Sequence, residues 1–364
     1  MNGMPTENGV RKLPAWKTLL FSALVLSVFL ALVTAAAELT LRNCCSSKYS
    51  RNDPPPPYDT AQKDELLGWK MTPGYAFDGK MKDESGGEYD ISIRYDSLGF
   101  KAFGDTGTAA PRILFIGDSY TASIEVSNER SFFNLLGDSL GAEVFAYGHA
   151  GYGTLQQYMV LDQWVDVIRP EVVVWEVCSN DFIDNYAPLE IACGYKVGER
   201  RPYLSADGEI YYERPLTAWQ MAGERLFVLQ WLEQSWRGLL KNLLGRESMV
   251  GEYFIATEGR AYGPFDAAVG ITEKIADKIK ARLPAGTKLM VFSADTYQPQ
   301  LDEFRRIFES RGFLFYDTPA TEVEKARTVE KQVVKSVDGY HWNERGHAIV
   351  AGALYPFIRQ AMAH

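Results

Sequence analysis

Ser119, Asp338 and His341 are the residues whose types and spacing could support covalent chemistry. Ser119 ends the motif 117–119 (GDS), which directly follows the apolar run 112–116, and the other two residues begin and end the motif 338–341 (DGYH). A serine hydroxyl is a poor nucleophile at neutral pH and needs a base that a third group holds in one tautomer. We therefore expect Ser119 to be a nucleophile, His341 its base, and Asp338 the group that orients the base.

Two further polar motifs follow apolar runs. Residues 148–153 (GHAGYG) come after 142–147 (AEVFAY), and residues 178–181 (CSND) come after 171–177 (EVVVWEV). Ligands of open α/β sheets collect at the carboxyl ends of the strands, so these motifs are expected to lie near Ser119. Taken singly, a glycine there could merely turn a loop and Asn180 could merely cap a helix.

The elements that must position these motifs alternate along the chain. Short β-branched runs predict strands, and segments with apolar residues at helical spacing predict helices between them. This alternation predicts a doubly wound α/β fold with a parallel sheet of roughly five strands. A further strand is expected before the sheet, at residues 88–95 (EYDISIRY). The predicted strands are 112–116, 142–147, 171–177, 288–293 and 313–316, and the predicted helices are 132–140, 154–168, 265–283, 298–310 and 343–362.

The order of the four motifs, GDS, a glycine loop, x-N-D and D-x-x-H, resembles that of the SGNH (GDSL-like) hydrolases over roughly residues 112–360. Residues 67–69 and 96–99 also resemble the lead-in of membrane-anchored bacterial members. The resemblance implies a flavodoxin-like sandwich and a catalytic triad of Ser119, Asp338 and His341. It further implies an oxyanion hole formed by the backbone N–H groups of Ser119 and Gly151 and by the Asn180 side chain.

Three positions depart from the family pattern. Tyr120 stands where GDSL has leucine, Cys178 replaces the glycine two residues before the asparagine, and Ala146 stands where the second motif often has asparagine. The first position packs rather than reacts. The other two affect the exact pose of Asn180, whose loss as one oxyanion donor would cost about 2.7 to 4 kcal/mol without silencing the enzyme.

The resemblance implies a serine-dependent ester hydrolase that acts through a seryl acyl-enzyme on a carbohydrate or lipid ester. One alternative with the same intermediate is an O-acyltransferase that moves acetyl groups to or from a cell-surface polysaccharide. A second alternative is a catalytically idle SGNH domain that serves as a binding or assembly subunit of an envelope complex, and the intact triad argues against it. No cofactor is expected, and the sequence leaves protein partners open.

Metal and nucleic-acid sites are disfavoured. His341 and His347 are six residues apart, which on a helix separates them by about 120°, so together with Glu344 they do not form a ligand set on one face. The net charge of -9 and the pI of about 5.2 provide no basic surface for nucleic acid. With 46% hydrophobic and 23% charged residues, the chain of 364 residues is expected to fold as a globular protein.

The N-terminal part is expected to be a tail, 1–17, followed by a transmembrane anchor or signal segment, 18–41. Residues 18–37 carry no charge and approach the ~20 residues needed to span a bilayer. Ala35 and Ala37 fit the small-x-small pattern of a signal-peptidase site, but the apolar run exceeds the ~7 to 15 residues of a signal core, which favours an uncleaved anchor. A short tail before one span most simply places the large domain outside the cytoplasm, in the periplasm or beyond.

The remaining boundaries are a Pro-rich linker, 42–62, a lead-in with short strands, 63–111, and the hydrolase domain, 112–364. An insertion, 188–262, is rich in tyrosine and tryptophan, which could stack on sugar rings or build a lid core. A leucine stripe from 226 to 243 predicts a lid helix that packs its own apolar side, although such a helix could also lie on a bilayer. Cys178 and Cys193 could pair in an oxidising compartment or remain buried thiols.

Overall fold

The computed structural model describes residues 14–45, 61–194, 200–215, 228–229, 232 and 250–363. The chain divides into two compact units, which are described separately. One consists of Met1–Asp53 with Leu216–Glu247, and the other consists of Pro54–Pro215 with Ser248–His364.

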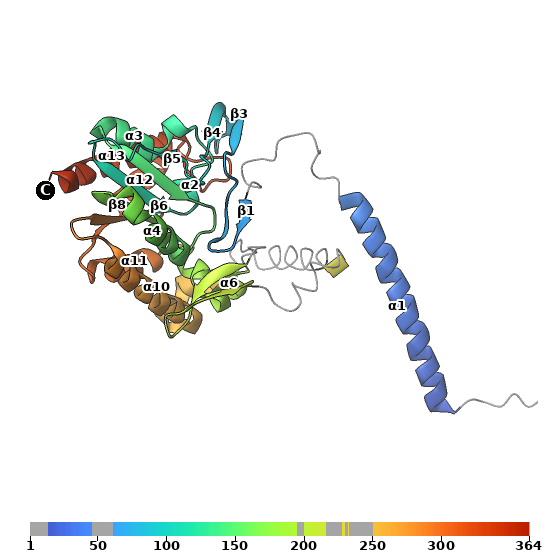
Figure 1. Ribbon diagram of the computed structural model, residues 1–364. Coiled ribbons are helices and arrows are strands. Elements are labelled where there is room, and N and C mark those ends of the chain that lie inside the picture. The colour runs from blue at the N-terminus through green and yellow to red at the C-terminus, as the bar shows by residue number, and fades with distance from the viewer. Residues whose placement is uncertain are drawn as a thin grey trace, which may run out of the picture. The chain divides into compact units, whose positions relative to one another are not determined.

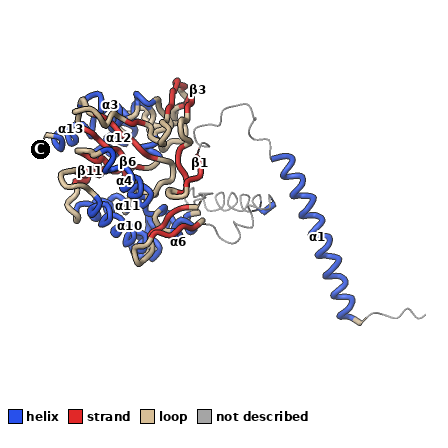
Figure 2. Tube along the Cα trace, in the orientation of Figure 1, coloured by secondary structure: helices blue, strands red, loops and turns tan. Residues whose placement is uncertain are grey.

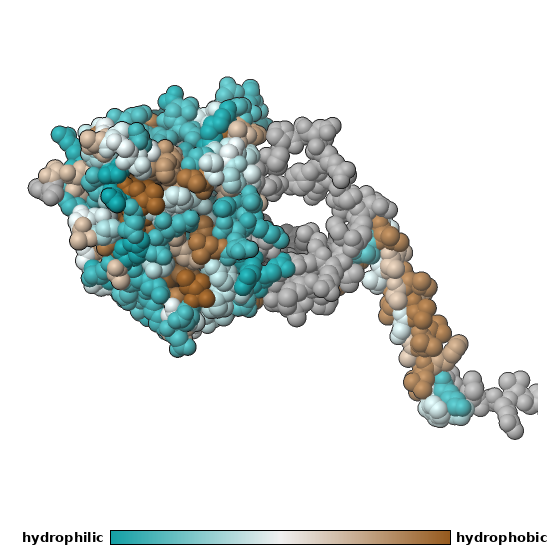
Figure 3. Space-filling model, viewed as in Figure 1, coloured by the Kyte–Doolittle hydropathy of each residue, from teal (hydrophilic) through white to brown (hydrophobic). Residues whose placement is uncertain are grey.

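The first unit contains one long helix, α1 (Ala15–Cys45). Its segment Leu19–Thr40 has a mean hydropathy of 2.5, so by length and composition it could cross a membrane. Figure 3 shows hydrophobic residues along this helix. The hydroxyls of Ser27 and Thr40 each donate to the carbonyl four residues earlier, which satisfies these polar groups within the helix.

The predicted segment 18–41 lies within α1, and the helix continues to Cys45, so residues 42–45 of the predicted linker are helical. At the other end, residues 61–62 of that linker belong to strand β1 (Ala61–Asp64). The part between them, 46–60, lies outside the described residues.

The second unit is built on a six-stranded sheet with the order β12-β11-β8-β6-β7-β5. Five strands are parallel, and their order along the sheet is the 2-1-3-4-5 order of flavodoxin-like folds, which confirms the predicted doubly wound α/β class. The sixth, the two-residue strand β5, pairs antiparallel with β7 at the edge and was not predicted. The strands are β5 (Ala102–Phe103), β6 (Arg112–Gly117), β7 (Glu143–Gly148), β8 (Val172–Val177), β11 (Lys288–Ser293) and β12 (Leu314–Tyr316).

Long helices cover both faces of this sheet (Figures 1 and 2). Side chains of α4, α10 and α11 pack on one face, and side chains of α3, α12 and α13 pack on the other. Of these six helices, only α12 was not predicted. Their bounds are α3 (Phe132–Leu140), α4 (Thr154–Ile168), α10 (Gly263–Arg282), α11 (Gln300–Glu309), α12 (Thr318–Thr328) and α13 (Glu344–Met362).

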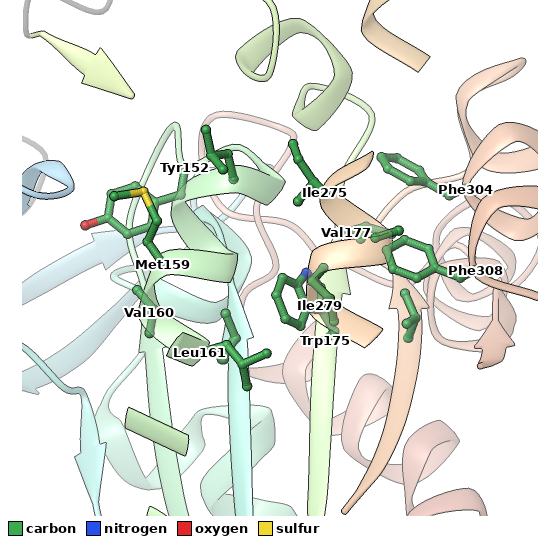
Figure 4. Close-up of a cluster of buried hydrophobic side chains, with 14 of the residues drawn as sticks. Tyr152, Met159, Val160, Leu161, Trp175, Val177, Ile275, Ile279, Phe304 and Phe308 are labelled. Atoms are coloured by element: carbon green, nitrogen blue, oxygen red, sulfur yellow. The ribbon is translucent and has the colours of Figure 1, made fainter. Parts of the chain in front are cut away.

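Successive residues of the central strands point to opposite faces, and both faces are buried, so these strands are apolar at nearly every position. In β6, Leu114 belongs to the core on one face and Phe115 to the core on the other. Figure 4 shows the first of these cores, where Trp175 of β8 lies among side chains of α4, α10 and α11 such as Ile279 and Phe308.

The lead-in forms two antiparallel hairpins, one of β1 with β2 (Gly68–Met71) and one of β3 (Ala76–Lys82) with β4 (Glu88–Arg94). The second confirms the strand expected at 88–95. A third hairpin pairs β9 (Arg201–Leu204) with β10 (Ile210–Glu213). The shorter helices are α2 (Ser119–Ala122), η2 (Asn128–Arg130), α5 (Asp181–Asp184), α6 (Ala187–Cys193), α9 (Val250–Glu258) and η3 (Gly259–Ala261).

The structure describes part of the predicted insertion, 188–262. Tyr203 is buried and donates its hydroxyl to Glu190, and Tyr212 donates its hydroxyl to the Leu66 carbonyl, so both tyrosines serve packing within the protein. The predicted leucine stripe lies outside the described residues apart from Leu229 and Leu232, which are helical, and so do the insertion's tryptophans.

Candidate active site

The turn that presents Ser119 is built by its neighbours. Strand β6 ends at Gly117, where a side chain would place a Cβ 2.1 Å from Oε2 of Glu176 and 2.3 Å from Oγ1 of Thr121, so only glycine fits. Asp118 caps helix α2 by accepting the N–H of Tyr120 at 3.0 Å. Ser119 therefore stands on a fixed turn at the carboxyl end of the sheet.

The three residues that the sequence singled out lie together in the structure. Oγ of Ser119 lies 2.8 Å from Nε2 of His341, and Nδ1 of the same ring makes a short hydrogen bond with Oδ2 of Asp338. Asp338 also accepts the backbone N–H groups of Tyr340 at 2.9 Å and of His341 at 3.0 Å. These bonds fix both the loop and the ring orientation, so the hydroxyl faces a nitrogen that can take its proton.

The charges around His341 make it a strong base. Burial would lower its pKa, but the carboxylates of Glu125 and Asp338 outweigh this effect and raise the pKa of His341 to about 9. Burial likewise works against the ionised form of Asp338, yet the hydrogen bond and charge of His341 lower the pKa of Asp338 to about 2. Because only the neutral ring can accept a proton, the base form of His341 increases as the pH rises through about 9.

Gly151 and Asn180, the other expected oxyanion donors, follow β7 and β8 on the two sides of β6. Gly151 has a φ of 75°, a backbone conformation that favours glycine. Nδ2 of Asn180 donates to Oδ2 of Asp184 at 2.8 Å and to Oδ2 of Asp118 at 3.3 Å. The amide of Asn180 thus has two acceptors within the protein, and the longer bond, to Asp118, is the weaker of the two.

Buried carboxylates lie beneath the turn, and no periodic pattern in the sequence predicts them. Glu176 is fully buried in β8 and accepts the N–H of Asp118 at 2.8 Å and the hydroxyl of Thr121 at 3.2 Å. Burial raises the pKa of Glu176 well above its ordinary range, and the neighbouring Asp118 and Asp181 raise it further. The buried Glu176 thus ties strand β8 to the turn that carries Ser119.

Arg201 is a second buried charge that the sequence did not reveal. Its guanidinium is fully buried, lies 2.7 Å from Oδ1 of Asp184, and donates to the Gly151 carbonyl at 2.8 Å. A buried charge is tolerated only when it is paired and hydrogen-bonded, as it is here. Through these bonds Arg201 joins strand β9 to the Gly151 loop and to helix α5.

The lead-in braces the same loop. Nε1 of Trp69 donates to Nδ1 of His149 at 3.1 Å, and the hydroxyl of Tyr152 donates to the Trp69 carbonyl at 2.6 Å. Burial lowers the pKa of His149 to about 4, so this histidine is neutral at physiological pH and serves as a hydrogen-bond acceptor. The glycine-rich motif is thus held by residues some eighty positions earlier in the chain.

A hollow of about 240 Å³ lies beside the serine turn and the 338–341 loop. Such a volume is below the ~300 Å³ at the lower end of pockets for drug-sized ligands, so it suits a single ring or a short chain. The lining residues are Tyr120, Ala294, Asp295, Thr296, Tyr297, Ala320, Val323, Glu324, Arg327, Lys335, Gly339 and Tyr340.

His347 lies apart from the serine. It is buried in α13, stacks on Phe132 at a ring distance of 5.8 Å, and its Nδ1 accepts the Phe132 N–H at 3.3 Å. Cys178 and Cys193, whose state the sequence left open, are free buried thiols, and Sγ of Cys178 donates to Oδ2 of Asp295 at 3.1 Å.

No family model and no curated protein matches this chain. Among solved structures, TesA is 14% identical with a TM-score of 0.39, covering 69% of this chain and 99% of TesA. A family 3 carbohydrate esterase from Clostridium thermocellum is 15% identical with a TM-score of 0.34, covering 70% of this chain and 99% of that esterase. A mutant of Axe2, an acetyl-xylooligosaccharide esterase from Geobacillus Stearmophilus, is 13% identical with a TM-score of 0.37. The match covers 70% of this chain and 95% of that esterase.

Because a TM-score below 0.5 does not establish a shared fold, the chemistry of this site is inferred from this chain's own residues. In the order of its motifs and in the sheet that carries them, the chain resembles the SGNH hydrolases.

Replacing His341 is expected to affect turnover, whereas replacing His347 is expected to affect stability. We expect His341→Ala to lower p-nitrophenyl acetate turnover by about 10⁴-fold or more with little change in stability, because it removes the proton acceptor of Ser119. We expect His347→Ala to lower the free energy of unfolding by about 1 to 3 kcal/mol while keeping turnover, since the buried N–H of Phe132 loses its acceptor. Initial rates and denaturant unfolding of both variants check this, and a larger rate loss in His347→Ala would show that the base is misassigned.

Proposed function

We propose that this protein is a serine-dependent ester hydrolase that acts through an acyl-enzyme on Ser119. The observation that carries the proposal is the pair of hydrogen bonds through His341, from Oγ of Ser119 to Nε2 at 2.8 Å and from Nδ1 to Asp338. A seryl nucleophile needs a base within hydrogen-bond reach and a carboxylate that orients this base, and these contacts provide both.

In the first step, Oγ of Ser119 bonds to the ester carbonyl carbon while its proton moves to Nε2 of His341. The tetrahedral intermediate collapses, the C–O bond to the alcohol breaks, and His341 returns the proton to the leaving oxygen. A water molecule then repeats the sequence on the acyl-enzyme and releases the acid. Asp338 stabilises the imidazolium in both steps and keeps its own charge.

The carbonyl oxygen becomes negative in each tetrahedral intermediate and needs hydrogen-bond donors. We assign this role to the backbone N–H groups of Ser119 and Gly151 and to the side chain of Asn180. Support comes from their places at the carboxyl ends of three adjacent strands, β6, β7 and β8. The positive φ of Gly151 and the bond from Arg201 to its carbonyl hold that loop in one conformation.

We propose a carbohydrate ester with a short acyl group as the substrate. The hollow lined by Tyr120 and Tyr340, whose chain neighbours are Ser119 and His341, is small, and polar side chains such as Asp295 and Lys335 also line it. Hydroxyl-rich sugars can form further hydrogen bonds with such groups, whereas a long acyl chain would remove these polar groups from water without offering any hydrogen bond. The insertion's tyrosines lend less support than the sequence suggested, because the hydroxyls of Tyr203 and Tyr212 bond within the protein.

We propose that α1 is an uncleaved, single-pass membrane anchor and that the catalytic domain lies on the periplasmic or extracytoplasmic side. The support is the apolar segment Leu19–Thr40, which carries a single charged residue, Glu38, near its end and whose 22 residues would span about 33 Å at ~1.5 Å per residue. The domain would then act on esters near the outer face of that membrane.

Hydrolysis and acyl transfer share one acyl-enzyme, so only the acceptor separates them. We expect p-nitrophenyl acetate to release acetate in a reaction that Ser119→Ala abolishes, with acetate as the main product even when xylan- or glucan-derived oligosaccharides are added. Acetylated sugar that depends on Ser119 would favour the transferase. Cleavage confined to long-chain phospholipids would contradict the carbohydrate proposal, and turnover that survives in Ser119→Ala would contradict the mechanism.

Membrane anchoring predicts that the full-length protein sediments with membranes and stays there after carbonate extraction at high pH, because an inserted helix is not displaced by charge or pH. Immunoblotting of the pellet and supernatant measures this. A mature protein whose N-terminal peptide begins at Glu38 would show instead that the segment is a cleaved signal.

A further inference from the structure

A second carboxylate approaches the histidine of the proposed triad. Oε1 of Glu125 lies 3.4 Å from Nδ1 of His341, the same nitrogen that bonds to Asp338. The side chain of Asp338 is 29% exposed, whereas that of Glu125 is only 1% exposed. The ring nitrogen thus faces one partly exposed carboxylate and one from the protein interior.

The Glu125 carboxylate is only partly satisfied by hydrogen bonds. Within the described part of the chain, its buried Oε1 accepts no hydrogen bond. Burial disfavours a charged carboxylate unless a positive charge lies close to it, and His341 lies within ion-pair distance of this oxygen. Burial raises the pKa of Glu125, and the charges of His341 and Lys101 lower it.

The backbone around Glu125 is fixed in place. The buried Nζ of Lys101 donates to the carbonyls of Ser123 and Val126, and the hydroxyl of Tyr89 donates to the Glu125 carbonyl at 3.0 Å. These bonds hold residues on both sides of Glu125, so its approach to the ring is set by the fold. Because the fold holds Glu125 next to Nδ1, its negative charge affects how readily His341 gains and loses a proton.

We propose that Glu125 is a positioning residue that, with Asp338, holds Nδ1 of His341 and stabilises the imidazolium formed when Ser119 gives up its proton. This inference rests on the proposed ester hydrolase function. Two carboxylates on one nitrogen make His341 a stronger base, and they also keep it protonated to a higher pH. Glu125 therefore increases the maximal rate and moves the active range toward alkaline pH.

Other charged and titratable groups face the pair and stay constant in the test. Those near the ring of His341 are Asp338, Asp118 and Tyr120, and those near Glu125 are Lys101, Asp338 and Tyr95. His347 interacts with the charges of His341 and Lys335.

The test is the pH dependence of kcat/KM for p-nitrophenyl acetate, measured on the full-length protein in detergent with EDTA present and with the Ser119→Ala rate subtracted. We expect Glu125→Gln to move the acidic limb down by about 1 to 3 pH units, the range for a neighbouring opposite charge, and to lower the alkaline plateau. The two profiles then cross, so the variant is the faster enzyme at low pH. Glu125→Asp, which keeps the charge but shortens the side chain, should shift the limb by less.

Glu129→Gln is the matched control, because it removes an exposed carboxylate four residues away and should leave the limb in place. If Glu125→Gln lowers the plateau without moving the limb, the residue is merely structural and the inference is wrong. If Glu125→Gln does not fold, an unshifted limb in Glu125→Asp contradicts the inference in the same way. A wild-type chain without Ser119-dependent turnover would instead contradict the proposed function itself.

Discussion

Charge held away from water is the constraint around which this site is built. The proposed mechanism places a positive charge on His341 during turnover, and two carboxylates, Asp338 and Glu125, lie at its Nδ1. Below the serine turn lie further buried acidic groups: Glu176, whose pKa is raised by burial, and Asp184, which pairs with Arg201. Each of these groups needs a partner at a fixed distance, which demands a rigid surrounding fold.

The parallel sheet supplies that rigidity. Because helices cover both faces, β6, β7 and β8 are buried along their length, and their carboxyl ends cannot shift independently. Ser119, Gly151 and Asn180 follow those ends, while His341 comes from the loop before α13. Trp69 and Arg201 extend the support from outside the sheet, one bonding to His149 and the other to the Gly151 carbonyl. The lead-in and β9 are thus part of the machinery that holds the site.

Much of this architecture could be predicted from sequence, because local rules determine it. The spacing of apolar residues predicted every parallel strand and five of the six helices that cover the sheet. The order of the motifs predicted that Ser119, Asp338 and His341 lie together, as they do in the structure. Helix α12 was missed because its apolar stripe is weak, and β5 because two residues carry no period. Glu125 and Arg201 could not be predicted, since their importance lies in long-range contacts that leave no mark on spacing.

The central claim is that Ser119 becomes covalently acylated with the help of His341. The most direct test is to mix the full-length protein with p-nitrophenyl acetate, quench it in acid within milliseconds, and locate the acetyl group by peptide mass spectrometry. The account predicts a transient acetyl group on Ser119 that does not form in His341→Ala. An enzyme that turns over the ester while acetyl never accumulates on Ser119, even when the deacylation step is slowed at low pH, would contradict it.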